Sequence, residues 1–155
     1  MEKIIVLITC FAIFSSPAFA QAPELKSREE FRRDSHQICH QKWSKRGELD
    51  RRMYNHCMEQ QMDGYQELVH LHGYSDQGWY ANTAYPYCSE RWTKRGVSDA
   101  RLIAHCLNQE REGIKDVMYY REKYGEDAVN PIVARALRSF NSWNMAAYKV
   151  KQYFE

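Results

Sequence analysis

An internal repeat is the feature of this sequence that most restricts its fold. When residues 39–65 are aligned with residues 88–114 at an offset of 49 residues, eleven positions are identical. The identical pairs are Cys39/Cys88, Trp43/Trp92, Lys45/Lys94, Arg46/Arg95, Gly47/Gly96, Asp50/Asp99, Arg52/Arg101, His56/His105, Cys57/Cys106, Gln60/Gln109 and Gly64/Gly113. Such matching indicates a duplicated supersecondary unit, so two similar elements are expected in tandem.

Each copy has the pattern of two helices joined by a short loop. In the first copy, Ser27 followed by Glu30 is the signature of a capping box at a helix start. Gly47 suits the left-handed position just beyond the end of that helix. Asp50 is a good N-cap for a second helix, which Gly73 ends. The second copy repeats these signals, so each copy is predicted to be a helical hairpin.

The C-terminal segment has a helical pattern of its own. Asn130 is suited to cap a helix, Pro131 fits its first turn, and apolar residues then recur at helical spacing to the end of the chain. The spacing of Met145, Tyr148 and Gln152 also repeats that of Met53, His56 and Gln60 in the second helix of the first copy. One long helix is therefore expected over residues 130–155, and it could be a degenerate third copy.

These patterns together predict one compact all-α domain over residues 27–155. Its fold class is two tandem disulfide-stapled helical hairpins plus a long C-terminal helix. The expected segments are a flexible N-terminus over 21–26, the first hairpin over 27–73, an aromatic-rich connector over 74–87, the second hairpin over 88–125, and the C-terminal helix over 130–155.

Helix geometry predicts how the repeated cysteines pair. Cys39 lies shortly before the end of one helix and Cys57 shortly after the start of the next. At about 1.5 Å of rise per residue, both cysteines stand at similar height in an antiparallel hairpin. We therefore expect disulfides Cys39–Cys57 and Cys88–Cys106, although four cysteines formally allow three pairings.

The first twenty residues are expected to be a cleaved signal peptide of the bacterial type. A charged start precedes an apolar run that is too short to span a membrane, and Ala18-Phe19-Ala20 has the small-x-small pattern of a cleavage site. A lipoprotein signal ending at Cys10 is a weaker alternative, because Cys10 comes too early in the apolar run. With an even number of remaining cysteines, the signal predicts a periplasmic or secreted protein without a membrane span.

Charge and motif content narrow the class of function. The formal net charge is +2, and acids and bases are interleaved along each helix, so nucleic acid is not an expected partner. Nothing resembles a nucleophile elbow, a zinc-binding His-Glu-x-x-His helix or a glycine-rich phosphate loop, so no cofactor is expected.

Two chemical alternatives depend on histidines. His36 and His40 lie four residues apart on a helix and could share a metal, although two ligands are few and neither recurs in the second copy. His56 and His105, with nearby carboxylates, could serve a small cell-wall hydrolase as bases. Because active sites are seldom duplicated intact in so short a chain, these repeated histidines fit a scaffold better than catalysis.

A binding or inhibitory module of the cell envelope is the preferred hypothesis, with another envelope or secreted protein as the partner. A rigid scaffold can present loops at little entropic cost, and the repeated Trp-x-Lys-Arg-Gly loops are candidates for presentation. The helix arginines Arg52 and Arg101 are expected to pair with neighbouring acids. The connector is the preferred contact surface, because its aromatic rings exceed what a turn requires. Its candidate contact residues are Trp79, Tyr80, Tyr85 and Tyr87.

Overall fold

The computed structural model describes residues 24–155. The predicted signal peptide, its cleavage after Ala20 and the predicted Cys10 alternative lie outside the described residues, as does the beginning of the expected flexible N-terminus. From residue 24 onward, none of the helices combines the length and the apolar character needed to cross a membrane.

The described chain is all-α apart from two very short β-hairpins, which confirms the predicted all-α class. Its α-helices are α1 (Arg28–Trp43), α2 (Arg51–Leu71), α3 (Tyr85–Trp92), α4 (Ala100–Tyr124), α5 (Glu126–Phe140) and α6 (Trp143–Phe154). The hairpins pair β1 (Ser44–Lys45) with β2 (Glu48–Leu49), and β3 (Thr93–Lys94) with β4 (Val97–Ser98). A 3₁₀ turn η1 (His72–Tyr74) and a π-helical turn η2 (Tyr80–Ala84) connect α2 to α3.

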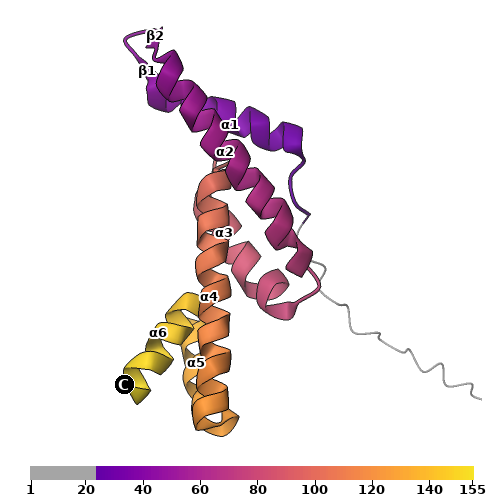
Figure 1. The fold of residues 1–155 in the computed structure, drawn as a ribbon, viewed down its shortest axis with the longest axis vertical. Coiled ribbons are helices and arrows are strands. Elements are labelled where there is room, and N and C mark those ends of the chain that lie inside the picture. The colour runs from indigo at the N-terminus through magenta and orange to yellow at the C-terminus, as the bar shows by residue number, and fades with distance from the viewer. Residues whose placement is uncertain (1–23) are drawn as a thin grey trace, which may run out of the picture.

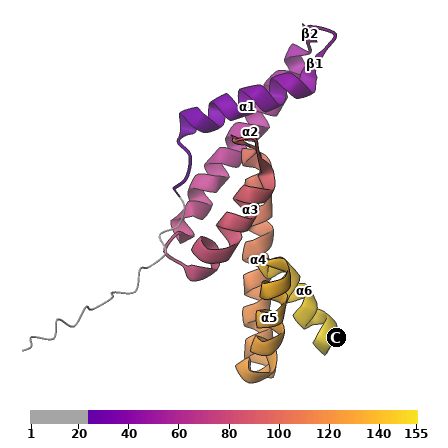
Figure 2. The ribbon, with the colours of Figure 1, turned by 180° about the vertical axis from the view of Figure 1, so that it is seen from behind.

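Three helical hairpin units follow one another along the long axis of the molecule (Figure 1). The first unit is α1–α2, the second is α3–α4 and the third is α5–α6. Helix α2 packs on α4, and α4 packs on α6, so the second helices of the units form a continuous stack. The view from behind shows the same order, with the first and third units at opposite ends (Figure 2).

Capping residues begin the helices where the sequence predicts them. Ser27 and Glu30 form the reciprocal capping box at the start of α1. The side chain of Asp50 accepts a hydrogen bond from the backbone N–H of Met53, and Asp99 accepts one in the same way at α4. The two copies of the repeat therefore share the same start signal for their second helices.

The two predicted disulfides are both present. Cys39 is bonded to Cys57 and Cys88 to Cys106, and in each pair the Cα atoms are 5.7 Å apart. Each bond joins the two helices of its own unit. The pairing inferred from helix height is confirmed.

The predicted single C-terminal helix over 130–155 is wrong, because the structure contains two helices there. Asn141 takes the left-handed conformation with φ 49° and ends α5, and Ser142 then caps α6 by accepting from the backbone N–H of Met145. The turn is so short that the apolar spacing continues across it, which explains the error. Nor is Asn130 a cap, since α5 begins at Glu126 directly after Gly125, whose φ is +88°.

The C-terminal pair α5–α6 takes the place of a third copy. Gly64 of α2 lies against the start of α4, where an added Cβ would be 2.5 Å from the Cα of Arg101. Gly113 of α4 lies against the start of α6 in the same way, where an added Cβ would be 2.5 Å from the backbone nitrogen of Asn144. In each of the first two units a glycine of the second helix thus contacts the N-terminus of the second helix of the next unit. The third unit lacks a disulfide.

Buried apolar residues form two clusters, and α4 contributes to both. The first cluster includes Phe31, Leu68, Tyr80 and Leu107 and lies between the first two units. The second includes Val117 and Val150 and lies between α4 and the α5–α6 pair, together with other residues of those helices. The helices are therefore held along the stack by successive interfaces, each with its own apolar core.

Candidate functional site

The aromatic connector lies mainly in the core. Tyr80 is fully buried and Tyr85 is 6% exposed, and their rings stack with centroids 5.5 Å apart. Burial raises the pKa of both phenols. Trp79 and Tyr87 are half-buried and pack against the same cluster. Tyr80 and Tyr85 are therefore not on an exposed contact surface: η2 leads straight into α3, and this helical path turns both rings toward the neighbouring helices. Contact of Trp79 and Tyr87 with a partner stays a prediction.

The weak metal candidates His36 and His40 are exposed on α1. Their rings stack 5.9 Å apart, and the ring of His36 also meets the ring of Tyr54 edge-on. Between residues 24 and 155, no group of three or more His, Cys, Asp or Glu side chains is placed to hold a metal ion. The structure adds no further ligand to the two histidines.

The repeated histidines are also exposed. His56 on α2 has its Nδ1 atom 4.0 Å from Oε2 of Glu59, and both side chains are mostly in solvent. In the described part of the chain, His105 has no carboxylate within that distance. Glu110 is 2% exposed and accepts hydrogen bonds from Ser142 Oγ and from the backbone N–H of Trp143. Its carboxylate therefore joins helices rather than facing an open cleft.

The repeated Trp-x-Lys-Arg-Gly segments form the tips of the β-hairpins. Arg46 and Gly47 have φ values of +51° and +86°, and Arg95 and Gly96 have values of +53° and +80°. Two consecutive positive φ angles are typical of the two-residue type I′ turn, which usually takes Asn-Gly. Gly47 thus adopts the predicted left-handed conformation, but in a hairpin turn rather than at a helix end. The glycine that follows Lys-Arg in both copies is the sequence signal that could have indicated this turn.

Arginine at the first position of each turn is energetically unfavourable. A side chain at left-handed φ costs roughly 1–2 kcal/mol, and Asn tolerates this conformation better than Arg. Both copies nevertheless carry Arg, at Arg46 and at Arg95. The backbone preference alone does not account for arginine at these two positions.

Four positively charged side chains stand at the two hairpin tips and are called the tip cations here. They are Lys45, Arg46, Lys94 and Arg95. All four are exposed, and within residues 24–155 none has a carboxylate within 4.0 Å. Among the described residues Arg52 and Arg101 likewise have no carboxylate within 4.0 Å, and Asp50 and Asp99 cap helices. Between residues 24 and 155 the tip cations therefore lack a bound carboxylate partner, although the first tip also carries the exposed Glu48 opposite Lys45.

A groove runs beside each hairpin. In the second unit it has a volume of about 470 Å³, and α1 supplies one wall through Gln37, Ile38 and Gln41. The other lining residues include Trp92, Lys94, Arg95, Val97 and Leu102. In the first unit, the matching groove has a volume of about 290 Å³ and is lined by Trp43, Lys45, Glu48, Leu49 and Asp50. Each groove thus combines an indole ring with at least one tip cation.

Another groove of about 470 Å³ lies between α5 and α6, lined by residues that include Ile132, Phe140, Lys149 and Tyr153. The hairpin grooves are the better candidate, because the same residue types recur at both.

Comparisons with protein families, with curated proteins and with solved structures found no match to this chain. The candidate site therefore rests on the geometry and chemistry of the hairpins alone.

Proposed function

We propose that this protein is an exported binding module that recognises another envelope or secreted protein through its two basic hairpin tips. The observation that carries the proposal is the recurrence of Arg46 and Arg95 at left-handed backbone positions, beside exposed lysines that have no carboxylate partner. A periplasmic or secreted location is part of the proposal. It is supported by the disulfides and by the signal-like N-terminal sequence.

The larger groove, in the second unit, favours a ligand with both a carboxylate and an apolar side chain. A carboxylate can bind Lys94 and Arg95 at the rim of the larger groove, where arginine offers a fork of N–H donors. The apolar part can pack on Trp92, Ile38 and Leu102. Tryptophan and arginine are frequent anchors at protein interfaces, so an acidic segment of a partner protein fits this chemistry.

The scaffold supports binding of this kind. In each of the first two units a disulfide joins the helices next to the β-hairpin, and the hairpin turn contains only two residues. Little conformational entropy is then lost when a partner orders the tip. An inhibitory role is included in this proposal, since a rigid tip inserted into the cleft of an enzyme would block it.

The test is affinity capture from an envelope extract of the source organism with two baits. One bait is the mature protein, and the other carries four substitutions at the tip cations: Lys45→Gln, Arg46→Asn, Lys94→Gln and Arg95→Asn. We expect a partner that is enriched on the first bait and lost on the second. The tip variant should remain folded, and it should gain up to about 1 kcal/mol per hairpin because Asn suits positive φ.

A control variant removes the same amount of positive charge from helix surfaces, through Arg28→Gln, Arg33→Gln, Arg135→Gln and Arg138→Gln. This variant should keep the partner, because its hairpins are unchanged. Equal capture by the tip variant and the unmodified protein would contradict the proposal. So would the absence of any enriched partner together with hydrolysis of purified cell wall that a His56→Ala, His105→Ala variant loses.

A further inference from the structure

The second hairpin already binds a helix within this molecule. Asp34 of α1 is 7% exposed, and its Oδ2 atom accepts a hydrogen bond of 2.9 Å from the backbone N–H of Ser98 in β4. Lys26, which lies just before α1, donates to the same Asp34 oxygen at 2.7 Å and to the carbonyl oxygen of Gly96 at 2.6 Å. An acid and a base from one helical segment thus engage one donor and one acceptor of the hairpin backbone.

The first hairpin has the same backbone arrangement. Leu49 pairs with Ser44 as Ser98 pairs with Thr93, and Asp50 N–H donates to Trp43 O as Asp99 N–H donates to Trp92 O. Because hydrogen-bonded and non-hydrogen-bonded pairs alternate in an antiparallel ladder, the N–H of Leu49 points away from its partner strand. Within residues 24–155, no hydrogen bond from it to a side chain occurs. It is the counterpart of the donor that Asp34 engages at Ser98.

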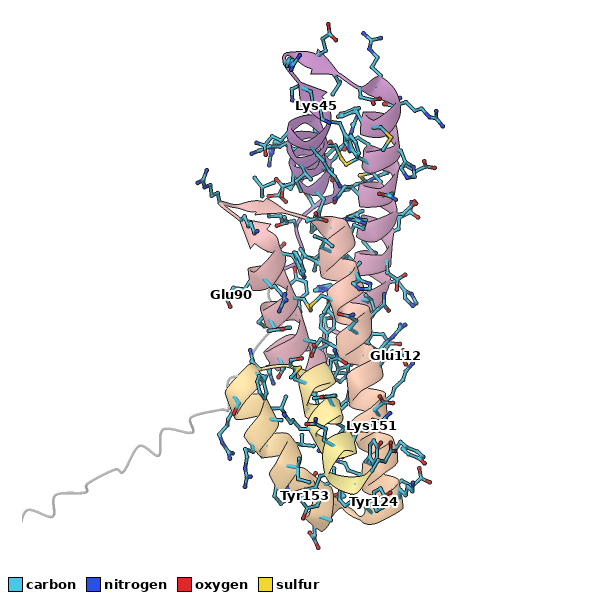
Figure 3. The ribbon with its side chains drawn as sticks, turned by 90° about the vertical axis from the view of Figure 1, so that its left-hand side faces the viewer. Lys45, Glu90, Glu112, Tyr124, Lys151 and Tyr153 are labelled. Atoms are coloured by element: carbon cyan, nitrogen blue, oxygen red, sulfur yellow. A yellow bond between two sulfur atoms is a disulfide. The ribbon has the colours of Figure 1, made fainter. Side chains whose placement is uncertain are left out.

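The groove beside the first hairpin corresponds to the groove beside the second, but within the described residues it lacks the wall that α1 provides there. Trp43, Lys45 and Asp50 line the groove of the first unit as Trp92, Lys94 and Asp99 line that of the second. In the second unit α1 forms the remaining wall, whereas the described residues supply no such helix to the first unit. Figure 3 shows Lys45 at the far end of the molecule, beyond which no further element is drawn.

We propose that hairpin β1–β2 binds an amphipathic helix of a partner protein, in the way that β3–β4 binds α1. A carboxylate on that helix accepts the N–H of Leu49, and a base about two turns earlier donates to the carbonyl oxygen of Gly47. The inference rests on the proposed binding function and assigns its partner at one of the two tips. A second copy of this chain does not supply the helix, because its own Asp34 is buried against its own β4.

The differences between the hairpins define what the partner helix should carry. Glu48 stands where the second hairpin has Val97, and in the second unit Val97 lines the groove together with Ile38. Ile38 is one helical turn after Asp34, so the matching position of a partner helix would lie near Glu48. A lysine or arginine four residues after the carboxylate would therefore suit the first hairpin better than an isoleucine.

The probe for this proposal is a fluorescein-labelled synthetic peptide of residues 24–43 with Cys39→Ser and Ile38→Lys. Its binding to the mature protein is followed by fluorescence anisotropy, and its position by the amide shifts of the ¹⁵N-labelled protein. We expect one saturable site, with the largest shift at the Leu49 amide and in the downfield direction. Asp34→Asn in the peptide should weaken binding by about tenfold or more, because a charge-assisted hydrogen bond is lost.

A matched peptide that keeps Ile38 controls for the specificity, and it should bind more weakly than the lysine peptide. Leu49→Pro in the protein removes the N–H donor and should abolish binding. The peptide variants keep the test valid if that substitution disturbs the hairpin. No binding up to about 1 mM peptide, equal binding of the Asp34→Asn peptide, or shifts centred on β3–β4 would each overturn the proposal.

The two experiments fail in distinguishable ways. The capture experiment tests whether binding depends on the charge of both tips, whereas the peptide experiment tests whether the backbone N–H of Leu49 binds a helix. A partner that depends on the tip cations, combined with no peptide binding, would leave the binding function standing and refute the helix as its ligand at β1–β2.

Discussion

At the scale of single residues, Gln61 and Glu110 occupy matching positions in the repeat, but each contacts a different kind of N-cap residue. Gln61 donates through Nε2 to Oδ1 of Asp99, at the N-cap of α4, with a distance of 2.9 Å. Glu110 instead accepts a hydrogen bond of 2.6 Å from the hydroxyl of Ser142, at the N-cap of α6. The carboxylate of Asp99 therefore meets an amide donor, and the hydroxyl of Ser142 meets a carboxylate acceptor. Neither contact buries two hydrogen-bond acceptors against each other.

The carboxyl of Glu110 should make the stability of the protein depend on pH. Burial is the largest influence on it and raises its pKa above 4.5, although hydrogen bonds from Ser142 and Trp143 act in the opposite direction. A raised pKa in the folded state means that the folded protein binds this proton more tightly than the unfolded chain. This contribution to stability is complete below about pH 4.5 and is lost as the pH rises through the raised pKa.

We predict that acidification favours the unmodified protein over a Glu110→Gln variant. Urea unfolding at about pH 7 and about pH 5 would measure the difference in free energy of unfolding between the two proteins. From about pH 7 to about pH 5, the free energy of unfolding of the unmodified protein should increase relative to that of the variant, since glutamine does not titrate. Movement in the other direction would show that the hydrogen bonds to Glu110 outweigh its burial.

At the scale of secondary-structure elements, two glycines permit the close contact between successive units. Gly64 lets the start of α4 approach α2, and Gly113 lets the start of α6 approach α4. Both are paired in the sequence repeat, but the reason for their pairing lies in packing rather than in backbone conformation, since neither has a positive φ. The repeat therefore encodes the joint between units as well as each unit.

Gly113→Ala should destabilise the protein, whereas Gly73→Ala should not. The new Cβ at position 113 would be 2.6 Å from the carbonyl carbon of Trp143, so α6 must move. We expect a loss of about 1–3 kcal/mol, as for overpacked cores. Nothing lies within 4 Å of a Cβ at Gly73, and alanine there should be neutral or stabilising by about 0.5 kcal/mol. Thermal unfolding of the two variants would check this, and equal melting temperatures would refute it.

At the scale of the whole molecule, the two apolar clusters divide the stack into a stapled part and an unstapled part. The first cluster lies between units that each contain a disulfide, whereas α5–α6 is held by packing on α4 and by the joint at Glu110. Helix α4 runs from one part into the other, as the middle and lower parts of Figure 1 show. The unstapled end should therefore open more readily than the remainder.

Native-state hydrogen exchange should show this division within α4 itself. Amides near Leu107 should be strongly protected, whereas those from Val117 to Tyr124 should exchange together with α5 and α6. Val133→Ala should speed exchange in the second cluster and leave the first cluster unchanged, since Val133 belongs to the second alone. Mass spectrometry of peptic peptides would measure both effects. Uniform protection along α4 would mean that the molecule opens as one unit.

The sequence by itself determined the features that depend on local chemistry and spacing. Helix class, the caps at Ser27, Asp50 and Asp99, and the pairing of the cysteines all follow from residues close together along the chain or at matching heights in a hairpin. The sequence also indicates the tip loops as candidate binding segments, but it does not indicate their β-hairpin form.

Only the tertiary structure decided which residues face the core, where the last helix breaks, and what lies beside each hairpin. Tyr80 and Tyr85 read as surplus aromatic residues in a connector, but contacts with distant helices bury them. The chain breaks at the left-handed Asn141, and the start of α6 then docks against Gly113; apolar spacing reveals neither. The contact of α1 with β3–β4 joins Asp34 to Ser98, 64 residues apart, and identifies the open hairpin β1–β2 as a candidate binding surface. Such contacts depend on how elements pack in space, which spacing along one helix does not specify.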